Sequence, residues 1–466
     1  MGWERMAGNN ENCTSICGNL VYNTLMSTPV ATLLPLVCLQ NFAAALDFIQ
    51  WLKKTNQSGW QLLPLSHPIA TPYRNQGVGL SPYFFDPQVP SQWRRWTLTR
   101  EEFVFQNRFW LTDYAHFQAI VQQLGTDEWW TWPPELRDRQ QAALATSRLR
   151  LEAAINGFID QQYFLYNQLT NLRRNALENE ITLIGDLPFY LARESSLVWA
   201  HQPLFLLGEA GQMRLESGVP AALDEPFAEQ YWGHPLYDWE NNEIADVMQL
   251  FNQRLQFMRG FTDLVRIDHA NGFFKYGAMS RQHHAWNRKL QGPGKPAVME
   301  LLRDLQNLRF GVYFEDIASD KMRLEQFMKE YDVVGSSVLT LAYNIEAQNP
   351  IAPEKVKDQE LEIASLAGNK IIFTSTHDTP PLLPWVQKLP SAIKARLKKL
   401  NNLRDNLDDR ALAGALRDLL ITQEARMTVI PWQDWWLESW RFNVPGHEEL
   451  TRWDYQIDVK KYLAKI

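Results

Sequence analysis

The stretch Leu264-Val265-Arg266-Ile267-Asp268-His269-Ala270-Asn271-Gly272 starts as an apolar run and ends in charged and polar residues. A short apolar run of this kind is typical of a strand that is buried on both faces. Its charged end must be solvated, paired or functional, because burying an unpaired charge is costly. Ligand sites in parallel α/β proteins lie at the carboxyl ends of strands, so Asp268 is a candidate catalytic carboxylate. A structural ion pair between Arg266 and Asp268 is an equally good interpretation of this stretch.

Seven other segments of the chain have a comparable strand pattern, and helical patterns separate them. They are residues 32–38, 59–65, 182–189, 310–316, 333–339, 371–378 and 427–434. Eight strands alternating with helices favour an α/β fold of the (β/α)8 TIM-barrel type over an open doubly wound sheet. No glycine-rich phosphate loop follows the first strand, which argues against a dinucleotide-binding or P-loop fold. Asn41 is the expected N-cap of a first helix over 42–54.

Two long insertions are expected after the second and third strands. Residues from about 88 to 180 have long helical patterns, with an interruption near Gly157, and predict a mainly helical insertion. Residues from about 190 to 240 are rich in aromatic side chains and predict an active-site loop, since loops of this length are usually functional. Residues 1–28 have no clear periodicity, so we expect a loose tail before a catalytic barrel over 29–466.

Composition narrows the class of protein. The net charge of −7 argues against nucleic acid or anionic membranes as partners. Three cysteines, all in the first 38 residues, indicate a reducing compartment, and no signal peptide is visible, so we expect a cytoplasmic protein. Cys13 and Cys17 have no second ligand cluster nearby, so neither a metal nor another cofactor is expected. The 19 tryptophans are an excess that suits stacking on sugar rings, although a Trp-rich core explains them equally well.

Acidic residues stand at the ends of four predicted strands, and two of them adjoin His269 and His377. In a barrel such strand ends converge on one face, which favours a functional set over separate structural caps. Two converging carboxylates without a metal cluster suit glycoside chemistry, one as nucleophile or base and the other as general acid. A third carboxylate can hold substrate hydroxyls and raise the pKa of the acid. The acids are Asp186, Asp268, Glu315 with Asp316, and Asp378.

Several segments resemble the amylomaltases, or 4-α-glucanotransferases, of the α-amylase-like clan of retaining glycoside hydrolases. Residues 266–269, Arg-Ile-Asp-His, are similar to the nucleophile strand of that family, and residues 314–317, Phe-Glu-Asp-Ile, to its acid/base strand. Residues 375–378, Ser-Thr-His-Asp, resemble the strand of its third carboxylate. Further matches follow in the family's order between about residues 30 and 455: Thr71–Tyr73, Ser81–Tyr83, Gly185–Pro188, Val198–His201, Gly218–Pro220, Trp232–Tyr237 and Asn443–Gly446.

The resemblance implies transfer of segments between maltooligosaccharides or other α-1,4-glucans by a double displacement. Asp268 would be the nucleophile, Glu315 the proton donor, and Asp378 the residue that stabilises the transition state. Arg266 would keep Asp268 ionised by charge proximity. The remaining candidates for substrate binding are Asp186, the hydrogen-bond donors His269 and His377, and the stacking residues Tyr73, Tyr83 and Trp232. A structural role is an equal alternative for each histidine and each aromatic residue taken alone.

The sequence also departs from the family pattern at three places. Cys38-Leu-Gln-Asn41 leads directly into a helix where the family has a Gly-Ile-Gly-Asp type of segment. Phe314 precedes Glu315 and Ala318 stands at a usual glycine position, while Thr379 stands at a usual asparagine position. These departures keep two alternatives open: a weakened or inactive glucan-binding homologue, and an α-glucan hydrolase.

Overall fold

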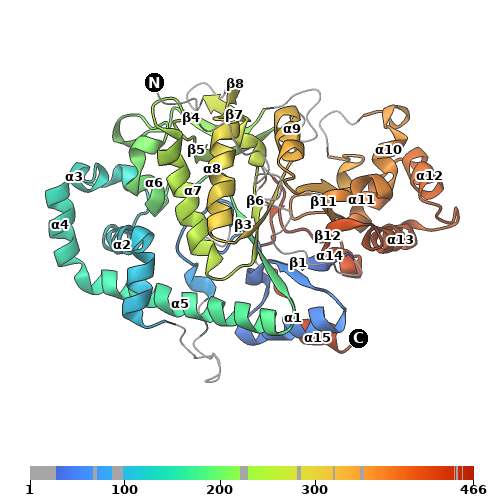
Figure 1. Ribbon diagram of the computed structural model, residues 1–466, viewed down its shortest axis with the longest axis horizontal. Helices are drawn as coiled ribbons and strands as arrows, with labels where there is room; N and C mark the ends of the chain where they lie inside the picture. Colours follow the sequence, from blue (N-terminus) through green and yellow to red (C-terminus); the bar gives the residue numbers. More distant parts are fainter. Residues whose placement is uncertain are drawn as a thin grey trace, which may run out of the picture.

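The computed structural model describes most of the chain, and Figure 1 shows the order of its elements. The described residues are 28–66, 71–84, 86, 98–220, 229–280, 285–317, 321–346, 351–445, 447, 450–453 and 455–466. Nearly all of the predicted tail over 1–28, and Ala318, lie outside them.

Eight parallel strands form one sheet, in the order β10-β11-β12-β1-β2-β3-β6-β9. The sheet is nearly closed as a barrel, because the amide of Phe314 at the end of β9 donates to the carbonyl of Val334 beside β10 (2.9 Å). The predicted TIM-type barrel is therefore confirmed. The strands are β1 (Val30–Leu33), β2 (Gly59–Gln61), β3 (Thr182–Leu187), β6 (Leu264–Ile267), β9 (Gly311–Phe314), β10 (Gly335–Val338), β11 (Gly368–Phe373) and β12 (Ala425–Pro431).

The first strand is shorter than its sequence pattern indicates. β1 ends at Leu33, and Leu36–Cys38 form a 3-10 turn instead of continuing the strand. Pro35 explains the difference, because it has no amide hydrogen to donate to a neighbouring strand. The following helix α1 (Phe42–Lys54) begins where expected, and the Asn41 side chain accepts a hydrogen bond from the amide of Ala44 (2.9 Å).

Helices surround the barrel on its outer side (Figure 1). The chain over 391–421 forms two helices, which are separated by a turn in which Asn402 has a positive φ of 54°. The helices that follow or precede barrel strands are α7 (Ile244–Arg259), α8 (Lys295–Asn307), α9 (Met322–Glu330), α11 (Leu382–Lys388), α12 (Ser391–Leu400), α13 (Asp409–Ile421), α14 (Trp432–Trp436) and α15 (Val459–Leu463).

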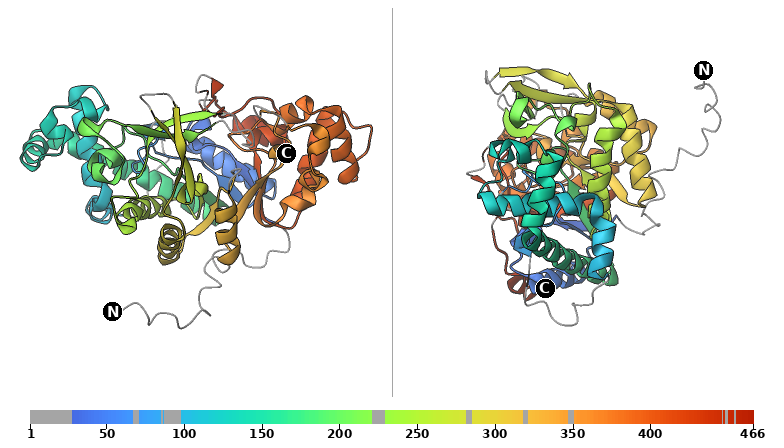
Figure 2. Two further views of the ribbon diagram at one scale, coloured as in Figure 1. Left: turned by 90° about the horizontal axis from the view of Figure 1, so that it is seen from above. Right: turned by 90° about the vertical axis from the view of Figure 1, so that its left-hand side faces the viewer.

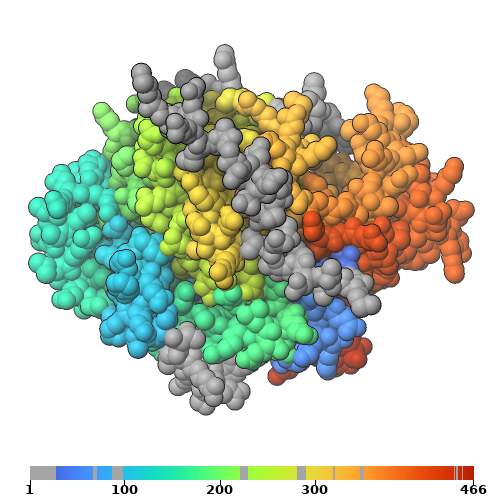
Figure 3. Space-filling model, viewed as in Figure 1, coloured from blue at the N-terminus to red at the C-terminus, as the bar shows by residue number. Residues whose placement is uncertain are grey.

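Between β2 and β3 the chain forms a helical group at one side of the barrel. Its members are α2 (Arg100–Leu124), α3 (Pro134–Arg137), α4 (Gln141–Arg150) and α5 (Glu152–Glu178). The helical pattern breaks at Leu151, whereas Gly157 lies within α5. Figures 2 and 3 show this group and the C-terminal helices α11 to α13 at opposite ends of the molecule. Although α2 and α5 are long, no helix in the described part of the chain is apolar enough to cross a membrane.

A second, antiparallel sheet adjoins the carboxyl end of the barrel. It has the order β5-β4-β7-β8, with β4 (Leu215–Val219), β5 (Gln230–Pro235), β7 (Lys275–Ser280) and β8 (Ala285–Gln291). The segment 190–240, expected to be a loop, thus contributes two of these strands. Glycine residues weaken the strand pattern in this part of the sequence. Glycine is needed at 277 because a Cβ there would lie 2.2 Å from the carbonyl oxygen of Gly218 on the neighbouring strand.

Candidate active site

A cavity of about 480 Å³ opens at the carboxyl ends of the barrel strands. This volume lies within the usual range for a small-molecule site. Its wall combines strand ends of the barrel, the segment 71–74, the antiparallel sheet and residues 443–453. Six of the residues predicted to form the site line it: Tyr73, Trp232, Asp268, His269, Glu315 and Asp378.

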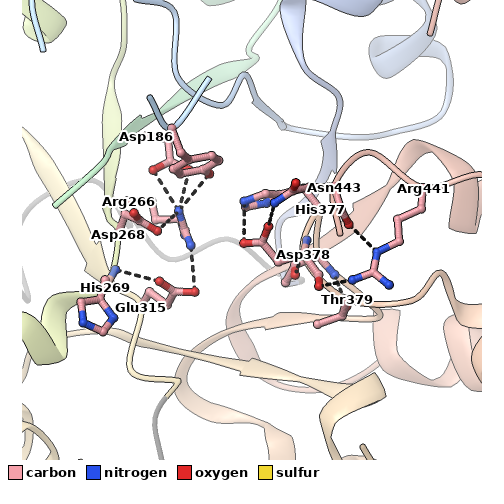
Figure 4. A network of polar contacts seen from close by, with 12 residues as sticks. Asp186, Arg266, Asp268, His269, Glu315, His377, Asp378, Thr379, Arg441 and Asn443 are labelled. Carbon is pink, nitrogen blue, oxygen red and sulfur yellow. Dashed lines mark hydrogen bonds and ion pairs between the residues drawn. The ribbon is translucent and has the colours of Figure 1, made fainter. Parts of the chain in front are cut away.

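A single buried guanidinium, that of Arg266, binds three carboxylates (Figure 4). Its Nη1 lies 2.7 Å from Asp186 Oδ2 and 2.9 Å from Asp268 Oδ1. Its Nη2 lies 2.9 Å from Glu315 Oε1. The ion pair between Arg266 and Asp268 is therefore present, and Asp268 also faces the cavity, so its catalytic role stays a prediction.

Asp186 lies beneath the cavity rather than in its wall. It is opposite Arg266 in the register of β3 and β6, and its side chain is completely buried. The hydroxyl of Tyr73 donates to Asp186 Oδ2 (2.8 Å), so this carboxylate holds both Arg266 and Tyr73. A direct contact of Asp186 with substrate, as predicted from the sequence, stays a prediction.

His269 connects the end of β6 to Glu315. Its backbone amide donates to Glu315 Oε2 (2.7 Å), while Arg266 occupies the other oxygen. The residue has φ 44° and ψ 45°, a left-handed conformation that is uncommon for a side chain with a Cβ. This conformation directs the amide towards Glu315, and the His269 ring packs edge-on against Trp232 at a centroid distance of 4.9 Å.

Asp378 lies across the cavity from the Arg266 cluster (Figure 4). His377 Nε2 is 2.9 Å from Asp378 Oδ2, and Asn443 Nδ2 donates to Oδ1 (2.5 Å). The backbone carbonyl of Asp378 accepts a hydrogen bond from Arg441 (2.5 Å). The His377 ring is buried and stacks on Tyr73 at 5.2 Å, so it supports the cavity wall from behind.

Asp268 and Asp378, on opposite sides of the cavity, have pKa values that are shifted in opposite directions. Burial raises the pKa of Asp268 well above its ordinary value; Arg266 opposes this shift, and Glu315 adds to it. Arg266 thus acts on Asp268 in the expected direction, towards the ionised form, but burial is the larger effect on this pKa. That Arg266 keeps Asp268 ionised stays a prediction. Burial also raises the pKa of Asp378, but His377 and Asn443 outweigh it and lower this pKa to about 2.

The low pKa of Asp378 predicts a component of stability that is lost in acid. A depressed pKa stabilises the folded state above the ordinary value of 3.8, and this stabilisation disappears as pH falls towards about 2. The difference corresponds to about 2 kcal/mol. We expect the stability gap between the wild type and Asp378→Asn, measured by urea unfolding, to narrow by that amount from pH 5 to pH 2. A gap that is independent of pH would contradict the assignment.

Tyr83 and Thr379 differ in their position relative to the cavity. Tyr83 is half exposed, does not line the cavity, and its hydroxyl is 3.4 Å from Gln456 Nε2. Thr379 does line the cavity, and its hydroxyl accepts a hydrogen bond from the amide of Thr376 (2.8 Å) and another from Thr340 Oγ1 (3.0 Å). Threonine therefore closes the turn after β11 without disturbing Asp378.

Other cavity residues were missed by the reasoning from sequence. Tyr276 and His234 reach the cavity from the antiparallel sheet, whose strands the sequence pattern did not indicate. Asn443 begins the segment 443–446, which resembles the family, but only the structure shows that its side-chain amide binds Asp378. Among the described residues no group of three or more histidine, cysteine or acidic side chains is arranged to hold a metal ion.

The chain is similar to several known proteins. A potato (Solanum tuberosum) plastid 4-alpha-glucanotransferase is 30% identical over 354 residues, which are 75% of this chain and 58% of that protein. The Thermus thermophilus 4-alpha-glucanotransferase is 29% identical over 448 residues, covering 84% and 85% of the two chains. The chain spans 58 to 66% of the length of several such relatives.

Solved structures and a family model complete the comparison. The Streptococcus agalactiae amylomaltase, solved with acarbose, superposes with a TM-score of 0.78 at 21% identity, over 94% of this chain and 98% of that one. The amylomaltase of Corynebacterium glutamicum superposes with a TM-score of 0.65 at 12% identity, over 94% and 73% of the two chains. The model of the 4-alpha-glucanotransferase family matches residues 90–460, and the chain therefore belongs to that family.

Proposed function

We propose that this chain is a 4-α-glucanotransferase that moves segments of α-1,4-glucan between maltooligosaccharides. The observation that carries the proposal is that Asp268 and Glu315 share one guanidinium, with Asp378 across the cavity. Two carboxylates held in this way lie near each other, which supports a retaining mechanism, where the pair is about 5–5.5 Å apart. The activities named for the potato and Thermus relatives agree with it.

In the first step, Asp268 attacks the anomeric carbon of the donor glucan. Glu315 donates its proton to the glycosidic oxygen, so the leaving segment departs as a neutral alcohol and a covalent glycosyl-enzyme remains. The amide of His269 and the guanidinium of Arg266 fix the two oxygens of Glu315 during this transfer. Asp268 reacts as the carboxylate, a form that the neighbouring charge of Arg266 favours.

In the second step, Glu315 accepts the proton of the 4-hydroxyl of an incoming glucan, which displaces Asp268 and restores the α linkage. Asp378 remains ionised because of its low pKa, and its negative charge stabilises the positively charged, oxocarbenium-like transition states. This sequence of steps needs neither a metal nor another cofactor.

Aromatic and polar side chains on both walls are proposed to bind the sugars. Trp232 and His269 stand on one side and Tyr73 on the other, while the buried His377 stacks on Tyr73 from behind the wall. Tyr83 would act only on a longer glucan, since it lies outside the cavity. Acarbose, the ligand of the streptococcal neighbour, is the inhibitor we expect this cavity to bind.

The antiparallel sheet is proposed to favour transfer over hydrolysis. Its strands β5 and β7 supply part of the cavity wall and so limit access of water to the glycosyl-enzyme. Asp186 is proposed to act from below through Arg266 and Tyr73. The low cysteine content supports a cytoplasmic location.

Incubation with maltotriose tests the proposal. We expect glucose together with maltopentaose and longer oligosaccharides, because a maltosyl group passes to a second maltotriose. Chromatography of the products distinguishes the alternatives. Glucose and maltose without longer chains would identify a hydrolase, and acarbose binding without any product would identify an inactive glucan-binding homologue.

A further inference from the structure

We propose that Asp434 is a positioning residue that sets the place of Asp378. The inference rests on the proposed function, in which Asp378 acts on the transition state. Asp434 lies in α14, immediately after β12, and is completely buried. It is not part of the cavity wall and forms no salt bridge within the described part of the chain. A buried carboxylate needs strong hydrogen bonds to be tolerated, and Asp434 has three.

These hydrogen bonds come from both ends of the segment that carries Asp378. Asp434 Oδ2 accepts from Thr374 Oγ1 and from Ser375 Oγ, both at 2.6 Å. Its Oδ1 accepts from the amide of Leu382 at 2.7 Å. Thr374 and Ser375 directly follow β11, and Leu382 is the first residue of α11. One carboxylate thus joins the beginning and the end of the loop over 376–381.

Two hydrogen bonds form within the loop over 376–381. The amide of Thr376 donates to Thr379 Oγ1 (2.8 Å), and the amide of Asp378 donates to Thr376 Oγ1 (3.2 Å). Asn443 and Arg441 also bind Asp378, and Thr340 binds Thr379. Asp434 adds the attachment of the two ends of the loop. Loss of the attachment would let the loop, with Asp378, move relative to Asp268 and Glu315 on the other wall.

The test replaces Asp434 by alanine and by asparagine, and uses Asp263→Asn as a matched control. Asp263 is also a largely buried carboxylate that accepts a backbone hydrogen bond, from Leu183 (3.0 Å), but it lies at the opposite end of β6. We expect Asp434→Ala to lower kcat for maltotriose transfer about 100-fold, as for a misplacement of about 1 Å, with KM changed only a few-fold. Asp434→Asn keeps the shape and part of the hydrogen bonding, so a smaller loss in kcat is expected.

A double-mutant cycle separates positioning from stability. If Asp434 acts through Asp378, adding Asp434→Asn to Asp378→Asn lowers kcat much less than adding it to the wild type. Equal losses in both backgrounds, or a loss matched by the Asp263 control, would overturn the proposal. Asp434→Asn serves in the cycle because the alanine variant removes three hydrogen bonds from a buried site.

Hydrogen exchange gives a second result that does not depend on activity. The amides of 376–379, which precede Pro380 and Pro381, should exchange faster in Asp434→Asn than in the wild type, while those of 264–272 exchange at the same rate. Unchanged exchange in 376–379 would overturn the positioning role. A wild-type protein without transfer activity would instead refute the proposed function, and the exchange result would still decide the role of Asp434.

Discussion

Asp268→Asn is expected to lower kcat/KM for maltotriose transfer on the order of 10⁴–10⁶-fold, the scale seen when a catalytic nucleophile is removed. The amide oxygen of asparagine can still contact Arg266, whose Nη1 lies 2.9 Å from Asp268 Oδ1 in the wild type. The loss therefore reports chemistry rather than position, because an amide does not form the glycosyl ester. Initial rates of glucose release measure the effect, and Asp263→Asn, at the other end of the same strand, is the control.

Chemical rescue shows on which side of the sugar Asp268 acts. In Asp268→Gly the space of the carboxylate becomes available to azide, which can attack α-maltosyl fluoride once from that side. A single displacement inverts the anomeric centre, so the expected product is β-maltosyl azide. An α-azide, or wild-type transfer by Asp268→Asn, would contradict the nucleophile assignment.

The barrel could be predicted from the sequence because its strands have a simple local cause. Apolar runs such as 264–267 are buried on both faces, and eight such runs recur along the chain, several of them ending in acids. The antiparallel sheet could not be predicted in this way. Its strands contain glycines such as Gly218 and Gly277, whose close approach depends on the partner strand and leaves no signal of strand propensity in the local sequence.

The residues of the candidate site could be predicted because they stand at strand ends, but the direction in which each acidic side chain points could not. Strand-end position brought Asp268, Glu315 and Asp378 to one cavity. Asp186 and Asp434 also stand at the ends of predicted strands, yet both are buried outside the cavity wall and accept hydrogen bonds from their neighbours. Which acids face the cavity depends on the twist and register of the barrel, and these are tertiary properties.

Glu315→Gln is expected to reduce maltotriose transfer by about 10²–10⁴-fold, the usual contribution of a general acid. Glutamine can keep a hydrogen bond from the amide of His269, so the side chain should stay in place without a proton to donate. The defect should depend on the leaving group. Glycosylation by α-maltosyl fluoride should fall far less, because fluoride departs without needing a proton from Glu315.

Azide again separates the two carboxylates. With Glu315→Gln and α-maltosyl fluoride, Asp268 still forms the glycosyl-enzyme, and azide then displaces it without requiring a base. Two displacements retain configuration, so α-maltosyl azide is expected here, opposite to the product of the Asp268→Gly variant. An equal loss with maltotriose and with the fluoride would mean that Glu315 only supports Arg266, to which it is bound at 2.9 Å, and that another group supplies the proton. Opposite azide anomers from the two variants would place Asp268 and Glu315 in the separate roles that a double displacement requires.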